Sequence, residues 1–239
     1  MSESIRLDKR LVALIQCSRG EAQKYIEGGW VRVDGEMIDQ PQFKVTSEKI
    51  ELHTDATLTP VMPATILFHQ PDGYDIEAPA AALPQITPQT RSKDDVSGIT
   101  LLKRHLARQR PTVPLESAAT GLLVFSQDGR ILRRLIDDAS KNEQEYVVEV
   151  MGEIAEDGID RLNQPMSLDG WQLPSTKVSW QSDHCLRFAL KNVRPGQIEY
   201  MCQQVGLTVV SMLRIRIGRV SMGKLKPGEW RYLPSGSLF

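Results

Sequence analysis

A single acidic residue, Glu116, lies just before a short apolar segment that has the pattern of a buried strand. The strand is predicted over residues 122–125, and an Asp128-Gly129 turn signal follows it. Working side chains are often carried on loops that a rigid strand holds in place, so Glu116 is a candidate for chemistry. By itself, a glutamate in a loop is more often a solvated charge than a catalytic group. The residue types around Glu116 are therefore needed to choose between these two interpretations.

The residues around Glu116 resemble the signature of RNA pseudouridine synthases of the RsuA/RluF type. That signature reads G-R-L-D-x-x-T/S-x-G-L, followed by an apolar strand and a turn similar to T-N-D-G. The positions that fit are Gly121, Leu122, Leu123, Asp128 and Gly129. In this register the family's catalytic aspartate falls on Glu116, its arginine on Pro114 and its Thr or Ser on Ala119. The resemblance implies isomerisation of uridine to pseudouridine in structured RNA, with ribosomal RNA favoured over tRNA.

The implied reaction breaks the bond between uracil N1 and the ribose and rejoins the base through C5. A carboxylate acts at the sugar, as nucleophile at C1′ or as base at C2′, and neither a cofactor nor a metal is implied. Glu116 supplies that group on an arm longer by one methylene, and a misplacement on the order of 1 Å can cost about a hundredfold in rate. The expected site also loses basic residues, which are replaced by Pro114, Gln70, Gly196, Glu199 and Tyr200.

Two interpretations account for these changes. The chain is either a divergent synthase in which Arg194, Arg214 or Arg216 replaces the lost arginine, or an RNA-binding protein on a synthase scaffold that no longer catalyses. Fold similarity does not decide between them, because function resides in the site. The resemblance favours the enzyme.

A second site residue is expected at Tyr146. Residues 145–150 have the alternation of a strand and resemble the family's K-E-Y-x-V-x-V, with Gln144 in place of the lysine. In the family this tyrosine stacks on the target uracil, and a flipped base needs such a flat surface to offset its lost stacking. The alternative is a core tyrosine whose hydroxyl is satisfied internally.

The first 58 residues have a different pattern. Leu7, Leu11, Leu14 and Ile15 have helical spacing, Ser18 and Glu21 form a capping-box motif for a second helix, and Asp34-Gly35 predicts a hairpin turn. A strand is predicted over 45–52. The order resembles a small RNA-binding domain named after a ribosomal protein of the small subunit. The basic residues that this domain would present to RNA are Lys9, Arg10, Arg19, Lys24 and Arg32.

The rest of the chain follows a proline-containing linker. We expect an RNA-binding domain over 1–58, a linker over 59–64 and a synthase-like catalytic domain over 65–239. Within the last part, residues 79–88 are predicted to be a loop, and Leu101, Leu102 and Leu106 indicate a short helix. Additional RNA contacts are expected from Lys103, Arg104, Arg214 and Arg216. The predicted class is α+β, with a mostly antiparallel sheet and a central cleft that holds Glu116 and Tyr146.

Composition sets the remaining limits. The chain has 239 residues, a net charge of −1 and an ordinary apolar content of 41%, so any RNA affinity must come from local basic clusters. No apolar run reaches the roughly 20 residues that span a bilayer, and the start lacks a secretory signal. The three cysteines are far apart, which argues against a disulfide framework or a metal site. We expect a cytoplasmic monomer.

Overall fold

The computed structural model describes residues 4–73, 79–116 and 118–239, which form two compact units. The first unit contains residues up to 63 together with 99–108, and the second contains 64–98 and 109–239. The predicted boundaries of the three parts stay a prediction, and the structure adds that residues 99–108 pack with the first unit. Among the described residues, no helix is both long and apolar enough to cross a membrane.

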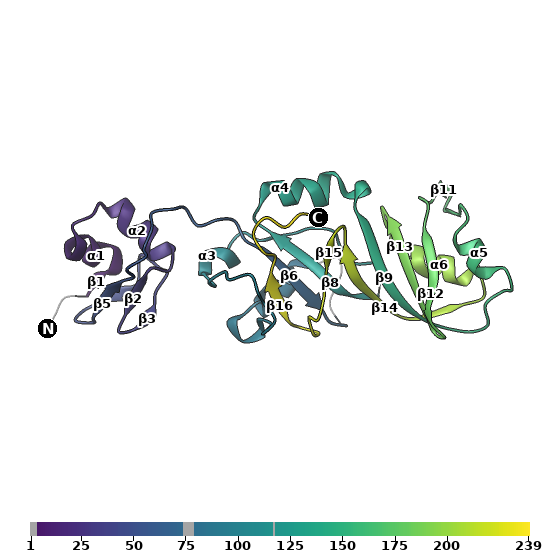
Figure 1. Cartoon of the computed structure of the whole chain (residues 1–239), viewed down its shortest axis with the longest axis horizontal. Helices are drawn as coiled ribbons and strands as arrows, with labels where there is room; N and C mark the ends of the chain where they lie inside the picture. Colours follow the sequence, from purple (N-terminus) through teal and green to yellow (C-terminus); the bar gives the residue numbers. More distant parts are fainter. Residues whose placement is uncertain (1–3, 74–78, 117) are drawn as a thin grey trace. The chain divides into compact units, whose positions relative to one another are not determined.

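The first unit has two nine-residue helices packed with short strands (Figure 1) and a third helix of four residues. Its elements are β1 (Ile5–Arg6), α1 (Leu7–Ile15), α2 (Arg19–Glu27), β2 (Val31–Val33), β3 (Glu36–Met37), β4 (Lys44–Val45), β5 (Ile50–Leu52) and α3 (Lys103–Leu106). The predicted capping box is present, because Ser18 accepts from the Glu21 N–H and the Glu21 carboxylate accepts from the Ser18 N–H. Strands β2 and β3 pair with Val33 opposite Glu36, which confirms the Asp34-Gly35 hairpin turn.

The single strand predicted over residues 45–52 is wrong. The chain leaves the strand after Val45 and starts a new one at Ile50, and the Glu48 carboxylate accepts the Thr46 N–H in the intervening turn. The core of this unit contains Leu7, Leu11 and Ile26, all of which are fully buried. Apolar periodicity therefore located the core correctly, while the local side-chain hydrogen bond that divides the strand was overlooked.

The second unit is built on one large sheet. The strands run in the order β12-β13-β9-β14-β8-β6-β16, with β15 paired to β14 and β7 to β8. Their bounds are β6 (Thr65–Gln70), β7 (Arg110–Pro111), β8 (Ala119–Ser126), β9 (Glu143–Met151), β12 (Lys177–Ser182), β13 (Cys185–Lys191), β14 (Thr208–Ile217), β15 (Val220–Ser221) and β16 (Trp230–Tyr232). All neighbours are antiparallel except β14 and β8, which run parallel. The prediction of a mostly antiparallel sheet is confirmed.

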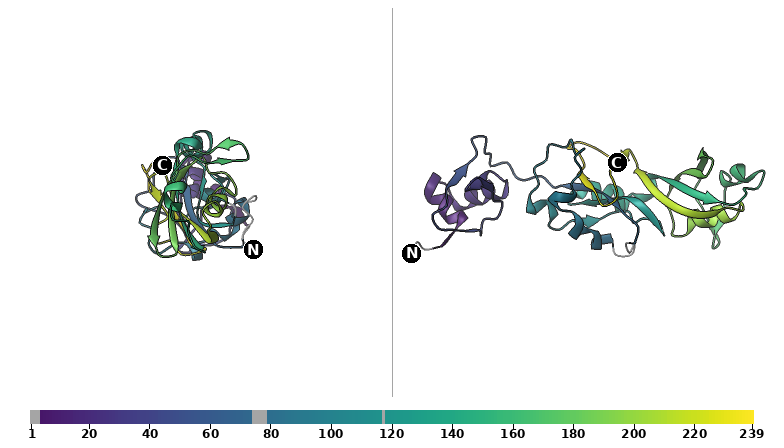
Figure 2. Two further views of the ribbon diagram at one scale, coloured as in Figure 1. Left: turned by 90° about the vertical axis from the view of Figure 1, so that its right-hand side faces the viewer. Right: turned by 90° about the horizontal axis from the view of Figure 1, so that it is seen from below.

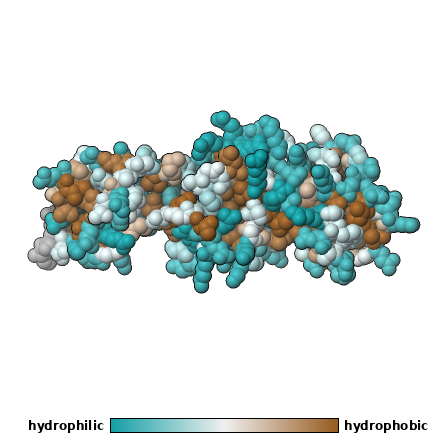
Figure 3. Space-filling view, viewed as in Figure 1, coloured by the Kyte–Doolittle hydropathy of each residue, from teal (hydrophilic) through white to brown (hydrophobic). Residues whose placement is uncertain are grey.

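Helices and one hairpin complete this unit. They are η1 (Pro79–Gln85), η2 (Pro88–Thr90), α4 (Gly129–Leu132), η3 (Arg133–Asp137), η4 (Ala139–Lys141), α5 (Gly158–Leu162), the hairpin of β10 (Ser167–Leu168) and β11 (Trp171–Gln172), and α6 (Gln197–Gln203). The loop predicted over 79–88 is wrong, since most of it forms a 3-10 helix that buries Ala82. The helix predicted after Gly129 forms, and its second half is π-helical. Its outward face is hydrophilic (Figure 3).

The core that matters for the candidate site lies under α5 and α6. Leu162 of α5 and Ile198 of α6 share a buried cluster with Tyr146 of β9 and Phe188 of β13. Figures 1 and 2 show this end of the second unit, where α5 packs beside β12 and α6 beside β14. Packing against the sheet fixes the start of α6, which is the element that meets Glu116.

The parallel pair of β14 and β8 depends on Gly121. Its φ is 106°, and a Cβ at this position would collide with the backbone oxygen of Arg214 and lie 2.8 Å from the Arg214 nitrogen. Only glycine allows the two backbones to approach this closely. This close approach brings the end of the Glu116 segment against Arg214.

Candidate active site

Glu116 is buried, with 3% of its surface exposed. Its Oε2 accepts the N–H of Gly196 at 2.9 Å, and its Oε1 accepts the N–H of Ile198 at 3.2 Å. Both donors are at the start of α6, where backbone N–H groups have no partner within the helix. The interpretation of Glu116 as a solvated loop carboxylate is wrong, because α6 holds both of its oxygens inside the second unit.

Arg214 holds the segment that carries Glu116. Its guanidinium is completely buried and donates from Nη1 to Pro114 O at 2.6 Å, from Nη2 to Val113 O at 3.0 Å and from Nε to Leu122 O at 2.8 Å. Three carbonyls on both sides of Glu116 are thus tied to one side chain of β14. Burial lowers the pKa of Arg214.

Gln144 joins Arg214 to Tyr146. The Gln144 Oε1 accepts from Arg214 Nη1 at 3.0 Å and from the Tyr146 hydroxyl at 3.1 Å. Tyr146 is fully buried, and burial raises the pKa of its hydroxyl. The negative charge of the nearby Glu116 carboxylate raises this pKa as well. The structure therefore brings Glu116, Tyr146 and Arg214 together from three separate parts of the sequence.

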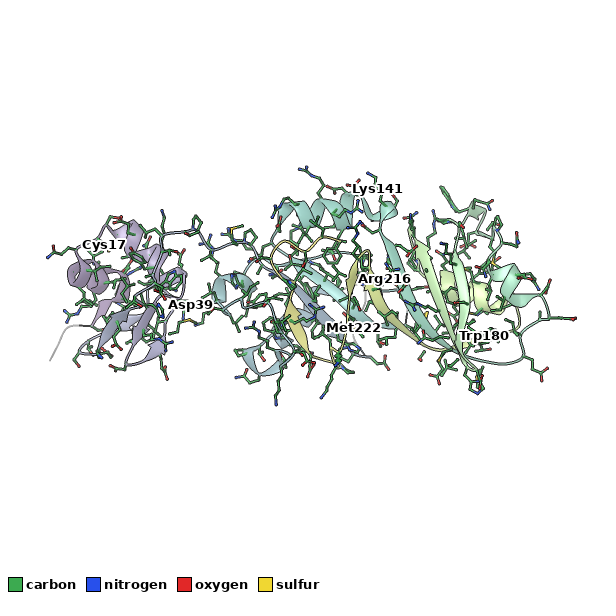
Figure 4. All side chains as sticks on the ribbon, in the orientation of Figure 1. Cys17, Asp39, Lys141, Trp180, Arg216 and Met222 are labelled. Carbon is green, nitrogen blue, oxygen red and sulfur yellow. The ribbon has the colours of Figure 1, made fainter. Side chains whose placement is uncertain are left out.

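The two other arginines considered as partners for Glu116 contact different groups. Arg216 pairs with Glu143 at 2.6 Å and with Glu145 at 2.8 Å, and Figure 4 labels it on the ribbon. The hydrogen bond from Arg216, reinforced by Arg187, lowers the pKa of Glu145 to about 2. Arg194 places its guanidinium carbon 4.7 Å from the ring centre of Trp171.

The basic residues of the first unit are mostly exposed, but some of them already contact acidic side chains or backbone carbonyls of the protein. Lys9, Arg10 and Lys24 are exposed on the two helices. Arg19 is also exposed, but its guanidinium contacts the fully buried Asp8 at 3.2 Å, and Arg6 contacts the same carboxylate at 2.9 Å. Burial by itself would raise the pKa of Asp8, but hydrogen bonds from these arginines, Gln23 and the Lys9 N–H hold it far below its usual range.

The remaining basic candidates are also partly occupied. Arg32 donates to the Gly35 carbonyl at 2.8 Å, and Arg104 pairs with Glu27 at 2.9 Å. Lys103 is exposed, and its backbone N–H donates to Asp39. The contributions of all these side chains to RNA binding stay predictions.

Sequence reasoning missed two parts of the site. The comparison with the family motif identifies Gln144 only as a replacement for a lysine. Its position two residues before Tyr146 puts both side chains on the same face of β9, and this spacing is a signal that they can meet. The backbone donors at Gly196 and Ile198 gave no signal in side-chain chemistry. Among the described residues, no group of three or more His, Cys, Asp or Glu side chains could hold a metal ion.

The two units correspond to two known kinds of domain. Residues 5–50 match the S4 domain family. The whole chain superposes on a crystal structure of a pseudouridylate synthase with a TM-score of 0.57, covering 96% of both chains at 19% sequence identity. The fold is therefore that of a pseudouridine synthase preceded by an S4 domain, as predicted.

Sequence relatives agree over nearly the full length. The chain is 26% identical to an uncharacterized RNA pseudouridine synthase of Aquifex aeolicus, over 96% of this chain and 92% of the relative. It is 25% identical to the dual-specificity RNA pseudouridine synthase RluF of Escherichia coli, over 98% of this chain and 77% of the relative. The chain is thus similar over nearly its full length to RNA pseudouridine synthases, RluF among them, in agreement with the resemblance seen in its motifs.

Proposed function

We propose that the protein isomerises uridine to pseudouridine in structured RNA, with ribosomal RNA as the substrate and Glu116 as the carboxylate that acts at the ribose. The observation that carries the proposal is the position of Glu116. The motif register aligns it with the family's aspartate, and it is buried near Tyr146, with both carboxylate oxygens accepting from backbone N–H groups.

The backbone donors account for the missing arginine of the family motif. Hydrogen bonds from N–H groups fix the direction of a carboxylate, which is one task of a paired cation. Gly196 and Ile198 supply those bonds here. Arg214 then acts on the backbone of the segment through Val113 and Pro114.

A second function has its own supporting observation. Tyr146 is 0% exposed and Glu116 is 3% exposed, and the Tyr146 hydroxyl is satisfied by Gln144. These are the features of a structural core, so an RNA-binding protein without catalysis is the alternative. In that case the S4 domain would carry the function.

Release of tritium separates the two functions. Ribosomal RNA labelled with tritium at uracil C5 is incubated with the full chain, and label released to water is counted. We expect release by the wild type and a loss of at least about a hundredfold in Glu116→Gln, as for removal of a group that acts directly in the reaction. Glu156→Gln, which changes an exposed carboxylate in the same unit, is the matched control and should not change the rate.

The outcomes are distinct. Release abolished by Glu116→Gln alone supports the synthase. No release from ribosomal RNA or tRNA, with RNA binding retained, overturns catalysis and supports the binding protein. A melting curve of Glu116→Gln identifies a loss of activity that comes from unfolding.

We propose that the first unit binds RNA mainly through phosphate contacts from Lys9, Arg10 and Lys24. Removal of one such cation should reduce the slope of log affinity against log salt by about 0.7 to 0.9. Lys24→Ala should show this change without loss of stability. Arg19→Ala also removes a partner of buried Asp8, so Arg19→Lys is compared with it to separate RNA binding from folding. An unchanged slope in Lys24→Ala would refute this surface.

The proposal includes the setting of the protein. An enzyme that modifies ribosomal RNA or tRNA works where these RNAs are made and assembled, so we place the chain in the cytoplasm, as a monomer. Sedimentation of the purified chain with and without RNA tests the monomer.

A further inference from the structure

An exposed tryptophan lies close in structure to the Glu116 site. Trp171 is 61% exposed, although tryptophan is usually well buried. It belongs to β11, which is labelled in Figure 1, and Leu168 of β10 pairs with it in the β10–β11 hairpin. Asp169 and Gly170 form the connecting turn with φ of 50° and 79°, a tight two-residue geometry that holds the ring on a short hairpin.

Arg194 covers part of this ring. The guanidinium carbon lies 4.7 Å from the ring centre, within the range of a cation–π contact. Among the residues that the structure describes, Arg194 forms no salt bridge. Its positive charge is therefore not matched by a carboxylate of those residues, and most of the Trp171 surface stays accessible to solvent.

A short, well-fixed segment joins this pair to Glu116. The Arg194 N–H donates to the Oε1 of Gln197 at 3.1 Å, and the Gln197 N–H donates to the Arg194 carbonyl at 3.0 Å. Gln197 is fully buried, and its neighbours Gly196 and Ile198 donate to Glu116. The position of Arg194 over Trp171 is thus coupled to the backbone that orients the candidate catalytic carboxylate.

An aromatic face beside an arginine is the combination that binds unpaired nucleotides. A base stacks on the ring, and the guanidinium meets a phosphate or stacks as well. We propose that Trp171 and Arg194 form a platform that stacks an unpaired base of the RNA beside the nucleotide that reaches Glu116. The choice of RNA as occupant rests on the proposed function.

Binding of a single-stranded oligouridine of about 12 nucleotides to the full chain tests the platform. Loss of one stacked base should weaken binding of Trp171→Ala about 5- to 150-fold at fixed salt, without a change in salt slope. Trp171→Phe should retain most of the affinity. Arg194→Ala should weaken binding and reduce the salt slope by about 0.7 if the guanidinium meets a phosphate.

Trp180 provides the matched control. It is also exposed, at 41%, but lies on the edge strand β12 and well away from the hairpin (Figures 1 and 4). Trp180→Ala should bind oligouridine as the wild type does. A duplex RNA of the same length should bind equally to the wild type and to Trp171→Ala, because its bases are already stacked.

The result that would overturn the platform is wild-type affinity of Trp171→Ala for oligouridine, or an equal loss in Trp180→Ala. The binding assay does not depend on catalysis. If the wild type releases no tritium from RNA while Trp171→Ala alone loses affinity, the platform stands and the catalytic proposal fails. If the wild type releases tritium and Trp171→Ala binds normally, the reverse holds.

Discussion

Replacement of Arg214 by lysine should destabilise the second unit strongly, although the charge is kept. The guanidinium donates to four oxygens, those of Val113, Pro114, Leu122 and Gln144. A lysine ammonium is a single nitrogen and cannot reach acceptors spread over both edges of a guanidinium. At least two of the four oxygens should lose their donor inside the protein.

The magnitude follows from the cost of a buried acceptor without a donor. At about 1 to 2 kcal/mol for each oxygen, the free energy of unfolding should fall by about 2 to 4 kcal/mol. For a unit of this size the melting temperature should then fall by roughly 5 to 15 °C. The calorimetric transition of the second unit in the full chain measures this shift. The rate of tritium release should fall by more than the fraction of unfolded protein accounts for, because the segment that carries Glu116 loses its hydrogen bonds to Arg214.

Arg216→Lys is the control, since Arg216 is on the same strand and its pairs with Glu143 and Glu145 are only partly buried. We expect it to cost about 1 kcal/mol or less. Equal melting temperatures for Arg214→Lys and Arg216→Lys would show that the buried guanidinium does not hold the site, and the account of Arg214 would be refuted.

Three further predictions concern single positions. Gly121→Ala should lower the melting temperature of the second unit by several degrees, because its Cβ meets the backbone of Arg214 and its φ is positive; equal melting would contradict the close approach. Asp8→Asn should destabilise the first unit in urea at neutral pH. Since the folded pKa of Asp8 is lowered, this stabilisation is fully present above pH about 4 and is lost progressively as the pH falls from there through the lowered pKa, so the difference between the two proteins should shrink in acid; a constant difference would exclude the ionised carboxylate as its source. Tyr146→Phe should lower the free energy of unfolding in denaturant by about 1 kcal/mol, since the buried hydrogen bond from the hydroxyl to the Gln144 side chain is removed; a much larger effect would assign the hydroxyl a wider role.

The parts of the fold that sequence predicted well are those with strong local patterns. The capping box at Ser18, the Asp34-Gly35 hairpin and the strand around Tyr146 all form. In each case the signal lies within a few residues, so a short stretch of sequence is enough to locate the element. The short helix in 79–88 was missed because alanine and proline composition describes both a loop and a 3-10 helix.

The candidate site was harder to predict because its chemistry depends on backbone groups. The sequence placed Glu116 near Tyr146, and the structure agrees. The residue types predict that Arg194, Arg214 or Arg216 replaces the family arginine. Arg214 is in the site, but the oxygens it contacts belong to carbonyls and an amide, while helix N–H groups orient the carboxylate. Neither fact is encoded in residue type.

The order in which the site can assemble follows from the separation of its parts along the chain. Glu116 meets donors 80 and 82 residues later, and Arg214 follows Pro114 by 100 residues. Contacts between residues so far apart in the sequence are slow to form, and the contact of Arg214 with Pro114 also lies beside the parallel pair of β14 and β8. During translation the S4 domain is synthesised long before β14 leaves the ribosome. In a growing chain the S4 domain would therefore be complete first, and the contacts around Glu116 would form only near the end of synthesis.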